Sequence, residues 1–326
     1  MRHNRLTKIL LLGMLFSFYL VTDAFSLTAE AALCLKKNKA INTHTVDYID
    51  KDGELIISLP EQEHILYFSD DLALMQKDGK QVYIDRAGKT VLEPTKYYSD
   101  SGPFADGLAT VRLGLSWGYI NKAGEVVVKP VFRATRMFHE GFAAVQPGAA
   151  GWGYINKEGK LVVPADYQKA KAFSEGLAPV MPIEKLNGWG YINSKGELVI
   201  SPQYSEAEPF SEGFAAVKVA DKQWGFIDHE GRLVLPANYQ EARPFSEELA
   251  AVQMNGRWGY IDKHGMQVIA CRYSNVHDFA DSRAAVCLYG RWGFIDKKGK
   301  MVVPAKYLEV ADFYKGFAGV IGEEQE

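Results

Sequence analysis

The chain has 326 residues, of which 47% are hydrophobic and 24% are charged, and its formal net charge is -3. This apolar share excludes a largely disordered chain, because disordered segments have too little apolar surface to bury. The near balance of 37 Lys and Arg against 40 Asp and Glu, with no long run of one sign, argues against a nucleic-acid-binding protein, in which a basic stripe is expected.

The start of the chain has the pattern of an export signal. Three basic residues precede an apolar run over residues 9–21, and the small-residue motif Ala29-Glu30-Ala31 follows it. The run is shorter than the roughly 20 residues that cross a bilayer as a helix, so the pattern favours a cleaved signal peptide over a permanent anchor. We expect residues 1–31 to be removed after Ala31 and residues 32–45 to form a lead-in. The mature chain, with no transmembrane segment, is expected to be secreted or extracytoplasmic at the cell envelope.

The chain contains three cysteines, Cys34, Cys271 and Cys287. An oxidising compartment permits a disulfide, and the closeness of Cys271 and Cys287 in the sequence makes them the favoured pair, with Cys34 left over. The alternative is that the thiols are unpaired and pack as small apolar groups.

Tryptophan-glycine pairs recur with a fixed period. All six tryptophans are followed by glycine and are spaced 34 to 37 residues apart. A period of about 20 to 50 residues marks a repeat array. Each pair opens the phrase Trp-Gly-aromatic-Ile-Asp/Asn, and two weaker copies, Tyr83-Ile84-Asp85 and Tyr48-Ile49-Asp50, precede them, which gives eight units. The repeat residues expected to be structural are Trp117, Trp152, Trp189, Trp224, Trp258, Trp292, Gly118, Gly153, Gly190, Gly225, Gly259 and Gly293.

Each unit predicts three short antiparallel strands. The first follows a phenylalanine, as at Leu177–Val180; the second holds the Trp-Gly phrase, as at Trp152–Ile155; the third is an aliphatic run, as at Leu161–Val163. Short runs rich in Val, Ile and aromatic residues, bounded by Gly and Pro, predict strands. The stretch that leads into the next phenylalanine is a candidate for a fourth, weaker strand. These landmark phenylalanines are Phe68, Phe104, Phe138, Phe173, Phe210, Phe245, Phe279 and Phe313.

The turn between the second and third strands is the clearest local signal. All eight copies place Asp or Asn first and Gly fourth, as in Asn156 with Gly159. The first side chain can accept backbone N–H bonds and the glycine tolerates a positive φ, which predicts a type I turn with a bulge. One carboxylate for each turn is far from the about six to eight oxygens that Ca²⁺ needs, so we expect turn capping and no metal.

The tryptophans are expected to pack between units. Side chains alternate along a strand, so Trp152 and Tyr154 share one face while Gly153 and Ile155 take the other. The glycine is expected to leave room for a ring or strand of the next unit. The tryptophan stands at the same position of each Trp-Gly repeat, so we interpret it as a packing residue and not as a platform on which sugar rings stack.

The two ends of the array favour a closed ring. The array starts with second and third strands at Tyr48–Ser58 and finishes with a first strand at Phe313–Ile321, so the ends add up to one unit. Pairing of these ends would remove unpaired edges. The predicted fold is all-β, with eight approximately 35-residue three-stranded antiparallel repeats in a propeller-like ring over residues 46–326. An open β-superhelix or solenoid is the alternative.

From about residue 46 to residue 321 the chain resembles the bacterial, secreted WG-repeat proteins, since the period, the Trp-Gly dipeptide and the hairpin turn coincide in six copies. The resemblance weakens in the first two copies, which lack Trp-Gly. It implies β-rich repeats without a common enzymatic activity.

No motif indicates catalysis, a cofactor or a metal. None of the seven histidines belongs to an H-x-x-x-H pair. His139-Glu140 and His277-Asp278 are interpreted as solvated loops and not as acid/base pairs. We therefore predict no catalytic residue, no cofactor-binding residue and no metal ligand, and a protein that is not an enzyme.

Function in a repeat protein is expected where the copies differ. The differences are the linkers 147–151 and 182–187 and two arginine pairs, Arg133 with Arg136 and Arg272 with Arg283. The predicted function is that of a secreted, non-catalytic domain that binds a protein or a cell-envelope polysaccharide, and no nucleic acid. Two alternatives stay open: a hydrolase with its site at the mouth of a propeller-like ring, and a structural surface spacer.

Overall fold

The computed structural model describes residues 45–60, 65–85, 88–94, 97–149, 151–183, 188–219 and 223–322. The predicted signal peptide with its cleavage site, nearly all of the lead-in, and Cys34 lie outside the described residues. All regular secondary structure in the described ranges is β-strand.

The strands have the following bounds: β1 Thr45–Asp50, β2 Leu55–Pro60; β3 Ile65–Ser69, β4 Leu72–Lys77, β5 Lys80–Ile84, β6 Thr90–Leu92; β7 Asp100–Ala105, β8 Leu108–Leu113, β9 Ser116–Asn121, β10 Val126–Phe132; β11 Ala134–Thr135, β12 Phe142–Gln146, β13 Trp152–Asn156, β14 Leu161–Ala170; β15 Leu177–Pro182, β16 Trp189–Asn193, β17 Leu198–Tyr204; β18 Glu206–Ala207, β19 Ala215–Val219, β20 Gln223–Ile227, β21 Leu233–Tyr239; β22 Glu241–Ser246, β23 Leu249–Met254, β24 Arg257–Ile261, β25 Gln267–Tyr273; β26 Asn275–Val276, β27 Ala284–Leu288, β28 Arg291–Ile295, β29 Met301–Tyr307; β30 Glu309–Val310, β31 Phe317–Ile321.

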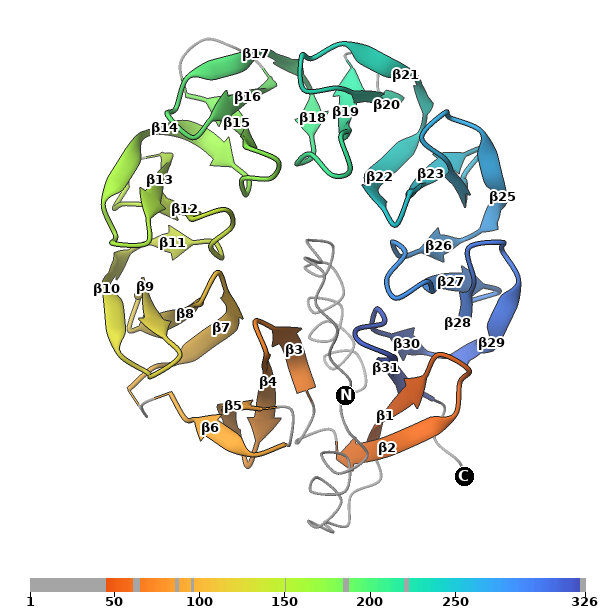
Figure 1. Ribbon diagram of the computed structural model, residues 1–326, viewed down its shortest axis with the longest axis horizontal. Helices are drawn as coiled ribbons and strands as arrows, with labels where there is room; N and C mark the ends of the chain where they lie inside the picture. Colours follow the sequence, from red (N-terminus) through yellow and green to blue (C-terminus); the bar gives the residue numbers. More distant parts are fainter. Residues whose placement is uncertain are drawn as a thin grey trace, which may run out of the picture.

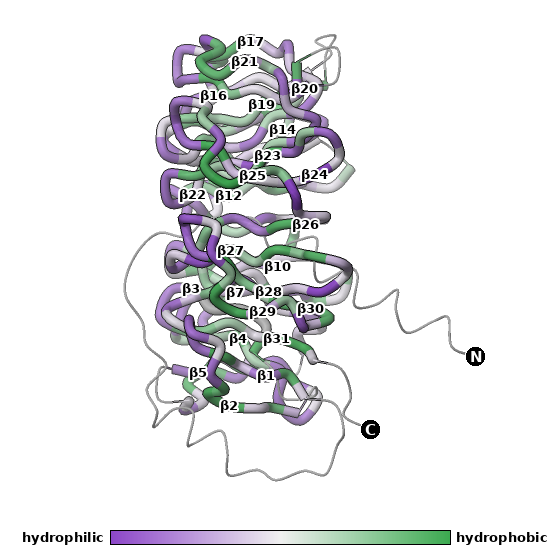
Figure 2. The backbone as a smooth tube through the Cα atoms, turned by 90° about the vertical axis from the view of Figure 1, so that its right-hand side faces the viewer, coloured by the Kyte–Doolittle hydropathy of each residue, from purple (hydrophilic) through white to green (hydrophobic). Residues whose placement is uncertain are grey.

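The strands form antiparallel blades arranged in a ring (Figure 1). Six sheets have four strands each, and a seventh, β11 to β17, joins two blades because the long strand β14 ends one blade and begins the next. Each blade therefore holds the three predicted strands and the short fourth strand that the sequence offered as an addition, such as β18 paired with β19. Seen from its side, the ring is taller than it is thick, with hydrophilic turns along one edge and hydrophobic stretches inside (Figure 2).

The two ends of the array complete one blade together. Strand β1 pairs with β31, with Tyr48 opposite Gly319, and the sheet order is β2-β1-β31-β30. On one side this blade packs through Tyr48 and Phe317 against Ile65 and Ala73 of the blade β3 to β6. On its other side Ile49 joins the core of the blade β26 to β29. The pairing predicted between the half-units is therefore present.

The predicted turn is also present. In the blade β11 to β14, Gly159 N donates to Asn156 O at 2.9 Å and Lys160 N donates to Asn156 Oδ1 at 2.9 Å. Gly159 has a φ of +78°, and the register of β13 with β14 shifts between Tyr154 and Ile155, as expected for a bulge.

The glycine of the Trp-Gly pair has a different role from the one predicted. A Cβ on Gly153 would lie 2.6 Å from Val163 O and 2.9 Å from the carbonyl carbon of Pro164. Both atoms belong to β14 of the same blade, so the expectation that the next unit fills this space is wrong. The bulged outer strand crosses close over the glycine, and the register shift explains why a side chain does not fit.

Aromatic rings hold neighbouring blades together. The Tyr or Phe two residues after each tryptophan packs on the landmark phenylalanine of the next blade, as in Tyr154 with Phe173, whose centroids are 4.8 Å apart. The same contact recurs in Tyr119 with Phe138 at 4.8 Å and in Phe294 with Phe313 at 4.7 Å. These buried edge-on pairs form the core between blades.

Candidate binding surface at the blade junctions

A tyrosine hydroxyl fixes one backbone position at most blade junctions. Tyr119 Oη donates to the carbonyl of Arg136 at 2.8 Å, and Tyr154 Oη donates to the carbonyl of Lys171 at 2.7 Å. Burial raises the pKa of Tyr154 well above its ordinary value, so the phenol keeps the proton that it donates. The accepting residue lies two positions before the landmark phenylalanine. We call the residues at this position the junction row: Gly102, Arg136, Lys171, Glu208, Arg243, His277 and Ala311.

The junction row differs in charge from repeat to repeat, and some of its members pair with residues of the next blade. Lys171 Nζ lies 2.8 Å from Glu208 Oε2, and the two side chains are about equally buried, with 21% and 20% exposed. His277 Nδ1 lies 2.6 Å from Oδ1 of Asp312, which belongs to the next blade. The first contact links two row positions, and the second links the row to the residue after Ala311.

Arg243 supports the carboxylates on either side of it. Burial raises the pKa of Glu208, and the charges of Lys171 and Arg243 oppose that rise. Burial likewise raises the pKa of Asp278 to about 6, against the charge of Arg243. From Lys171 through Glu208 and Arg243 to Asp278 the charges therefore alternate in sign.

Tryptophans lie beneath the row. The guanidinium of Arg136 is 5.3 Å from the ring centroid of Trp152, and that of Arg243 is 5.4 Å from Trp258. The His277 ring lies 4.8 Å from that of Trp292. A cation over an indole face is stabilised by the negative face of the ring. The Trp-Gly motif therefore supplies a platform for the variable side chain of its own blade.

The tryptophans also pack, as the sequence predicted, but to different extents. Trp189 and Trp224 are buried, with 2% and 5% exposed, whereas Trp117, Trp152, Trp258 and Trp292 are partly buried. The indole N–H groups of Trp189 and Trp224 are buried and donate no hydrogen bond to the described part of the chain.

The structure places the predicted variable residues at different sites of the ring. Arg136 belongs to the junction row and Arg133 is exposed just before β11. Arg283 Nε donates to the carbonyl of Lys51 at 3.0 Å, which joins the blade β26 to β29 to the terminal blade. Arg272 Nη2 donates to Tyr273 Oη at 2.9 Å. The linkers 147–151 and 182–187 are described only in part, at 147–149, 151, 182 and 183.

The interpretation of His277-Asp278 as a solvated loop is wrong. The His277 side chain is 20% exposed and pairs with Asp312, and Asp278 Oδ1 is buried without a hydrogen bond from the described residues. His139 is partly buried as well, and burial lowers its pKa. Sequence reasoning missed Lys171, Glu208 and Asp312. The signal that could have revealed the row is a charged residue two positions before the landmark phenylalanine. This signal is incomplete, because the first and last described row members are the uncharged Gly102 and Ala311.

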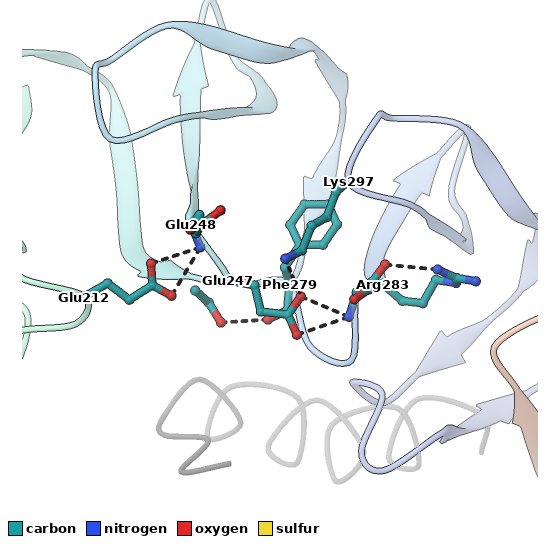
Figure 3. A network of polar contacts seen from close by, with 8 residues as sticks. Glu212, Glu247, Glu248, Phe279, Arg283 and Lys297 are labelled. Carbon is teal, nitrogen blue, oxygen red and sulfur yellow. Dashed lines mark hydrogen bonds and ion pairs between the residues drawn. The ribbon is translucent and has the colours of Figure 1, made fainter. Parts of the chain in front are cut away.

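A second set of contacts lies along the inner side of the ring, where the turns before the first predicted strands point inward (Figure 1). The carboxylate of each turn accepts a backbone N–H from the turn of the next blade: Glu248 N donates to Glu212 Oε2 at 2.9 Å and Ser282 N donates to Glu247 Oε2 at 3.0 Å (Figure 3). A cation of the next blade approaches the same carboxylate, as in Lys297 Nζ at 3.1 Å from Glu247 Oε2. The acceptors of these turn clasps are Asp70, Asp106, Glu140, Glu175, Glu212, Glu247 and Asp281.

The turn clasps are structural. They satisfy amides in tight turns whose first residue has a positive φ, such as Glu140 at 52°. The eighth turn carries Lys315 in place of the acid, at the terminal blade that both ends of the chain complete. The clasps therefore run without a break from Asp70 to Gly316.

The disulfide suggested between Cys271 and Cys287 is not formed, since both residues are free thiols. Cys287 is buried in β27, and Cys271 Sγ accepts a hydrogen bond from Gln267 Nε2 at 3.1 Å. Burial raises the pKa of the Cys271 thiol. The two thiols belong to strands of different blades, β25 and β27, and the alternative of packed, unpaired thiols describes them.

Within the described ranges, no group of three or more His, Cys, Asp and Glu side chains is arranged to hold a metal ion. The same ranges contain no helix of the length and apolar character that crossing a membrane requires.

Comparison with known proteins identifies the repeat. A family model described as "WG containing repeat" matches residues 48–80, 83–114, 117–146, 152–181, 189–222, 224–258, 258–292 and 292–321. No curated protein matches the sequence.

Solved structures resemble the fold. The computationally designed Ika8 protein has a TM-score of 0.53 and 12% identity, covering 81% of this chain and 97% of its own. BamB from Moraxella catarrhalis, a β-propeller, has a TM-score of 0.51 and 9% identity, covering 86% of this chain and 99% of its own. At such identities the likeness concerns the fold alone.

Proposed function

Because the chain belongs to the WG containing repeat family, we propose that it is a non-catalytic binding ring, secreted or held at the cell envelope, that recruits a protein or an envelope polymer. The repeated residues build the ring, and the residues that vary among the repeats contact the partner. The predicted export signal supports the extracytoplasmic part of the proposal.

The junction row is the observation that carries this proposal. In the core the copies are alike, with the same aromatic pairs and turns, whereas the row changes from Arg136 and Lys171 to Glu208, Arg243 and His277. Arg136, Lys171, Arg243 and His277 lie against tryptophans, and several of these tryptophans are themselves partly exposed. Arg and Trp are enriched where proteins bind partners, because each combines a large contact area with directed polar groups.

Retention of partners by the immobilised protein tests the proposal. The purified protein is incubated with isolated cell-envelope fractions and, separately, with the extracellular proteins of the same cells. Saturable retention by one fraction, absent from a heat-unfolded sample, is the expected result. No retention from either fraction would contradict a binding role.

Mass spectrometry of the protein recovered from the medium or the envelope of an expressing cell tests its location. The expected mature chain begins at Ala32. Recovery of the intact chain from the cytoplasm alone would contradict the extracytoplasmic role.

One specific observation favours a second candidate function, a hydrolase. His277 and Asp312 form a close pair, and the neighbouring Asp278 has a pKa raised by burial to about 6. A carboxyl group that titrates near neutrality beside a histidine is suited to general acid-base catalysis.

A panel of chromogenic esters, glycosides and peptides separates the two candidates. Turnover that is lost in His277→Gln and kept in the exposed control His264→Gln would favour the hydrolase. The binding proposal predicts no turnover that depends on His277.

A further inference from the structure

Among the residues that the structure describes, the cation Arg136 of the junction row has no carboxylate partner. Lys171 has Glu208, Arg243 lies between Glu208 and Asp278, and His277 has Asp312. The row neighbours of Arg136 are instead Gly102 in the preceding blade and Lys171 in the following one. The alternation of sign around the ring therefore fails at Arg136, where two cations follow each other.

The surroundings of Arg136 make this absence significant. Its guanidinium lies over Trp152, and among the described residues it makes no ion pair. The surrounding protein partly desolvates the guanidinium, which lowers the pKa of Arg136. The side chain is nevertheless exposed, so a partner can reach a cation that already rests on an indole ring.

Two further cations lie in or next to the same sheet. Arg133 is exposed just before β11, where its N–H donates to Gln146 O. Lys169 is exposed on β14, with Nζ 5.9 Å from the centroid of Trp189, the ring that Lys171 also approaches. Neither side chain forms an ion pair with a residue that the structure describes. The carboxylate of Asp166 is exposed on β14 and is not paired with any of the three cations.

We infer that Arg136 binds a carboxylate side chain of an acidic segment in a partner protein, with the exposed Arg133 and Lys169 adding positive charge to the same region of the ring. The inference rests on the proposed binding function and assigns its partner class. The neighbouring junctions show the chemistry that fits, because Glu208 from the adjacent blade pairs with Lys171, and Asp312 in the same way contacts His277. At Arg136 the partner supplies that carboxylate. A guanidinium also matches a carboxylate with two parallel hydrogen bonds, which a lysine cannot form.

The test measures binding of fluorescein-labelled poly-L-glutamate by fluorescence anisotropy in about 0.15 M salt, so that weak surface attraction is screened. The protein is compared with Arg136→Gln and with Arg257→Gln. The control removes the same charge from an exposed arginine at β24, in another blade. Circular dichroism and thermal unfolding of each variant show that the ring is intact.

The expected result is saturable binding that weakens about tenfold in Arg136→Gln, the loss of one charge-assisted hydrogen-bonded contact, and changes less than twofold in Arg257→Gln. No binding of poly-L-glutamate by the parent protein would overturn the inference, as would an equal loss in both variants. Tighter binding of polyphosphate with the same dependence on Arg136 would overturn the acidic-protein assignment in favour of a phosphate polymer.

Failure of this inference is distinguishable from failure of the proposed function. If envelope or extracellular fractions are retained saturably and equally by the parent protein and Arg136→Gln, the binding ring stands and the assigned site is wrong. If neither fraction is retained, the proposed function fails, whatever the polymer result.

Discussion

The Nζ atom of Lys171 lies 2.8 Å from Oε2 of Glu208, although the two residues are in adjacent blades and 37 positions apart in the chain. Each is the residue two before the landmark phenylalanine of its own repeat. The contact therefore exists only because the repeats stack in one register. It makes the junction row a part of the structure as well as a candidate binding surface.

This pair predicts an asymmetry between single and double substitutions. Lys171→Met leaves Glu208 partly buried without its cation, so we expect the free energy of unfolding to fall by about 1–2 kcal/mol. This loss is smaller than for a fully buried pair, because both side chains keep some contact with solvent. Lys171→Met with Glu208→Met should restore most of the loss. Urea unfolding measures both, with the exposed Lys160→Met as control. The pairing would be contradicted if the loss in free energy of unfolding in the double variant equalled the sum of the losses in the two single variants.

Asp278 predicts a pH dependence. Burial raises its pKa from 3.8 to about 6, so the folded protein holds this proton more tightly than the unfolded chain. Its contribution to stability is therefore fully present below pH 3.8 and is lost as the pH rises to about 6. Asp278→Asn, which has no such proton, should gain on the order of 2 kcal/mol relative to the parent between pH 4 and pH 7.

The measurement is thermal or urea unfolding of the parent and Asp278→Asn across this pH range, with the exposed Asp166→Asn as the charge-matched control. A constant difference between parent and Asp278→Asn at all pH values would show that Asp278 does not titrate in this window.

The turn clasps predict that the inner carboxylates hold blades together. Glu212 accepts Glu248 N and pairs with Lys263 at 3.1 Å. Glu212→Ala removes both contacts and leaves an amide unsatisfied in a tight turn, so we expect a loss of about 1–2 kcal/mol in the free energy of unfolding. Glu230→Ala, at an exposed turn, should change it little. Hydrogen exchange at Glu248 should quicken in the first variant and not in the second. Unchanged exchange there would count against the clasp.

The glycine of the Trp-Gly pair predicts a steric cost. In Gly153→Ala the new methyl group meets Val163 O at 2.6 Å, and a backbone atom cannot yield as a flexible side chain does. We expect a loss of about 2–3 kcal/mol from overpacking, measured by urea unfolding. Gly322→Ala, which meets nothing within 4 Å, is the control. Equal stability of the two variants would mean that β14 can move away from the glycine.

Local signals were enough to predict the repeat unit. The 34 to 37 residue spacing predicted the number of blades, and Asn156 with Gly159 predicted the hairpin turn, because both depend on residues close in the sequence. The half-units at the ends also predicted the pairing of β1 with β31. The space beside Gly153 was predicted to be filled by the next unit, whereas β14 of the same blade fills it. A sequence pattern does not show which strand crosses a glycine.

The charged row and the turn clasps could not be predicted in the same way. A lysine at 171 and a glutamate at 208 become partners only after the register between blades is known. In the same way His277, which looked solvated beside Asp278, is paired with Asp312 from the next blade. The predicted disulfide is absent for a related reason. Cys271 and Cys287 are close in the sequence, but their strands belong to different blades.

Binding of a partner by the variable junction row is tested by the retention of envelope and extracellular components by three immobilised proteins. These are the parent, a row variant with Arg136→Gln and Arg243→Gln, and a control with Arg257→Gln and Lys160→Gln, which loses the same charge at exposed positions. The account predicts saturable retention by the parent and the control and a loss of about tenfold or more in the row variant. Equal retention by all three proteins, or retention by none, would contradict it.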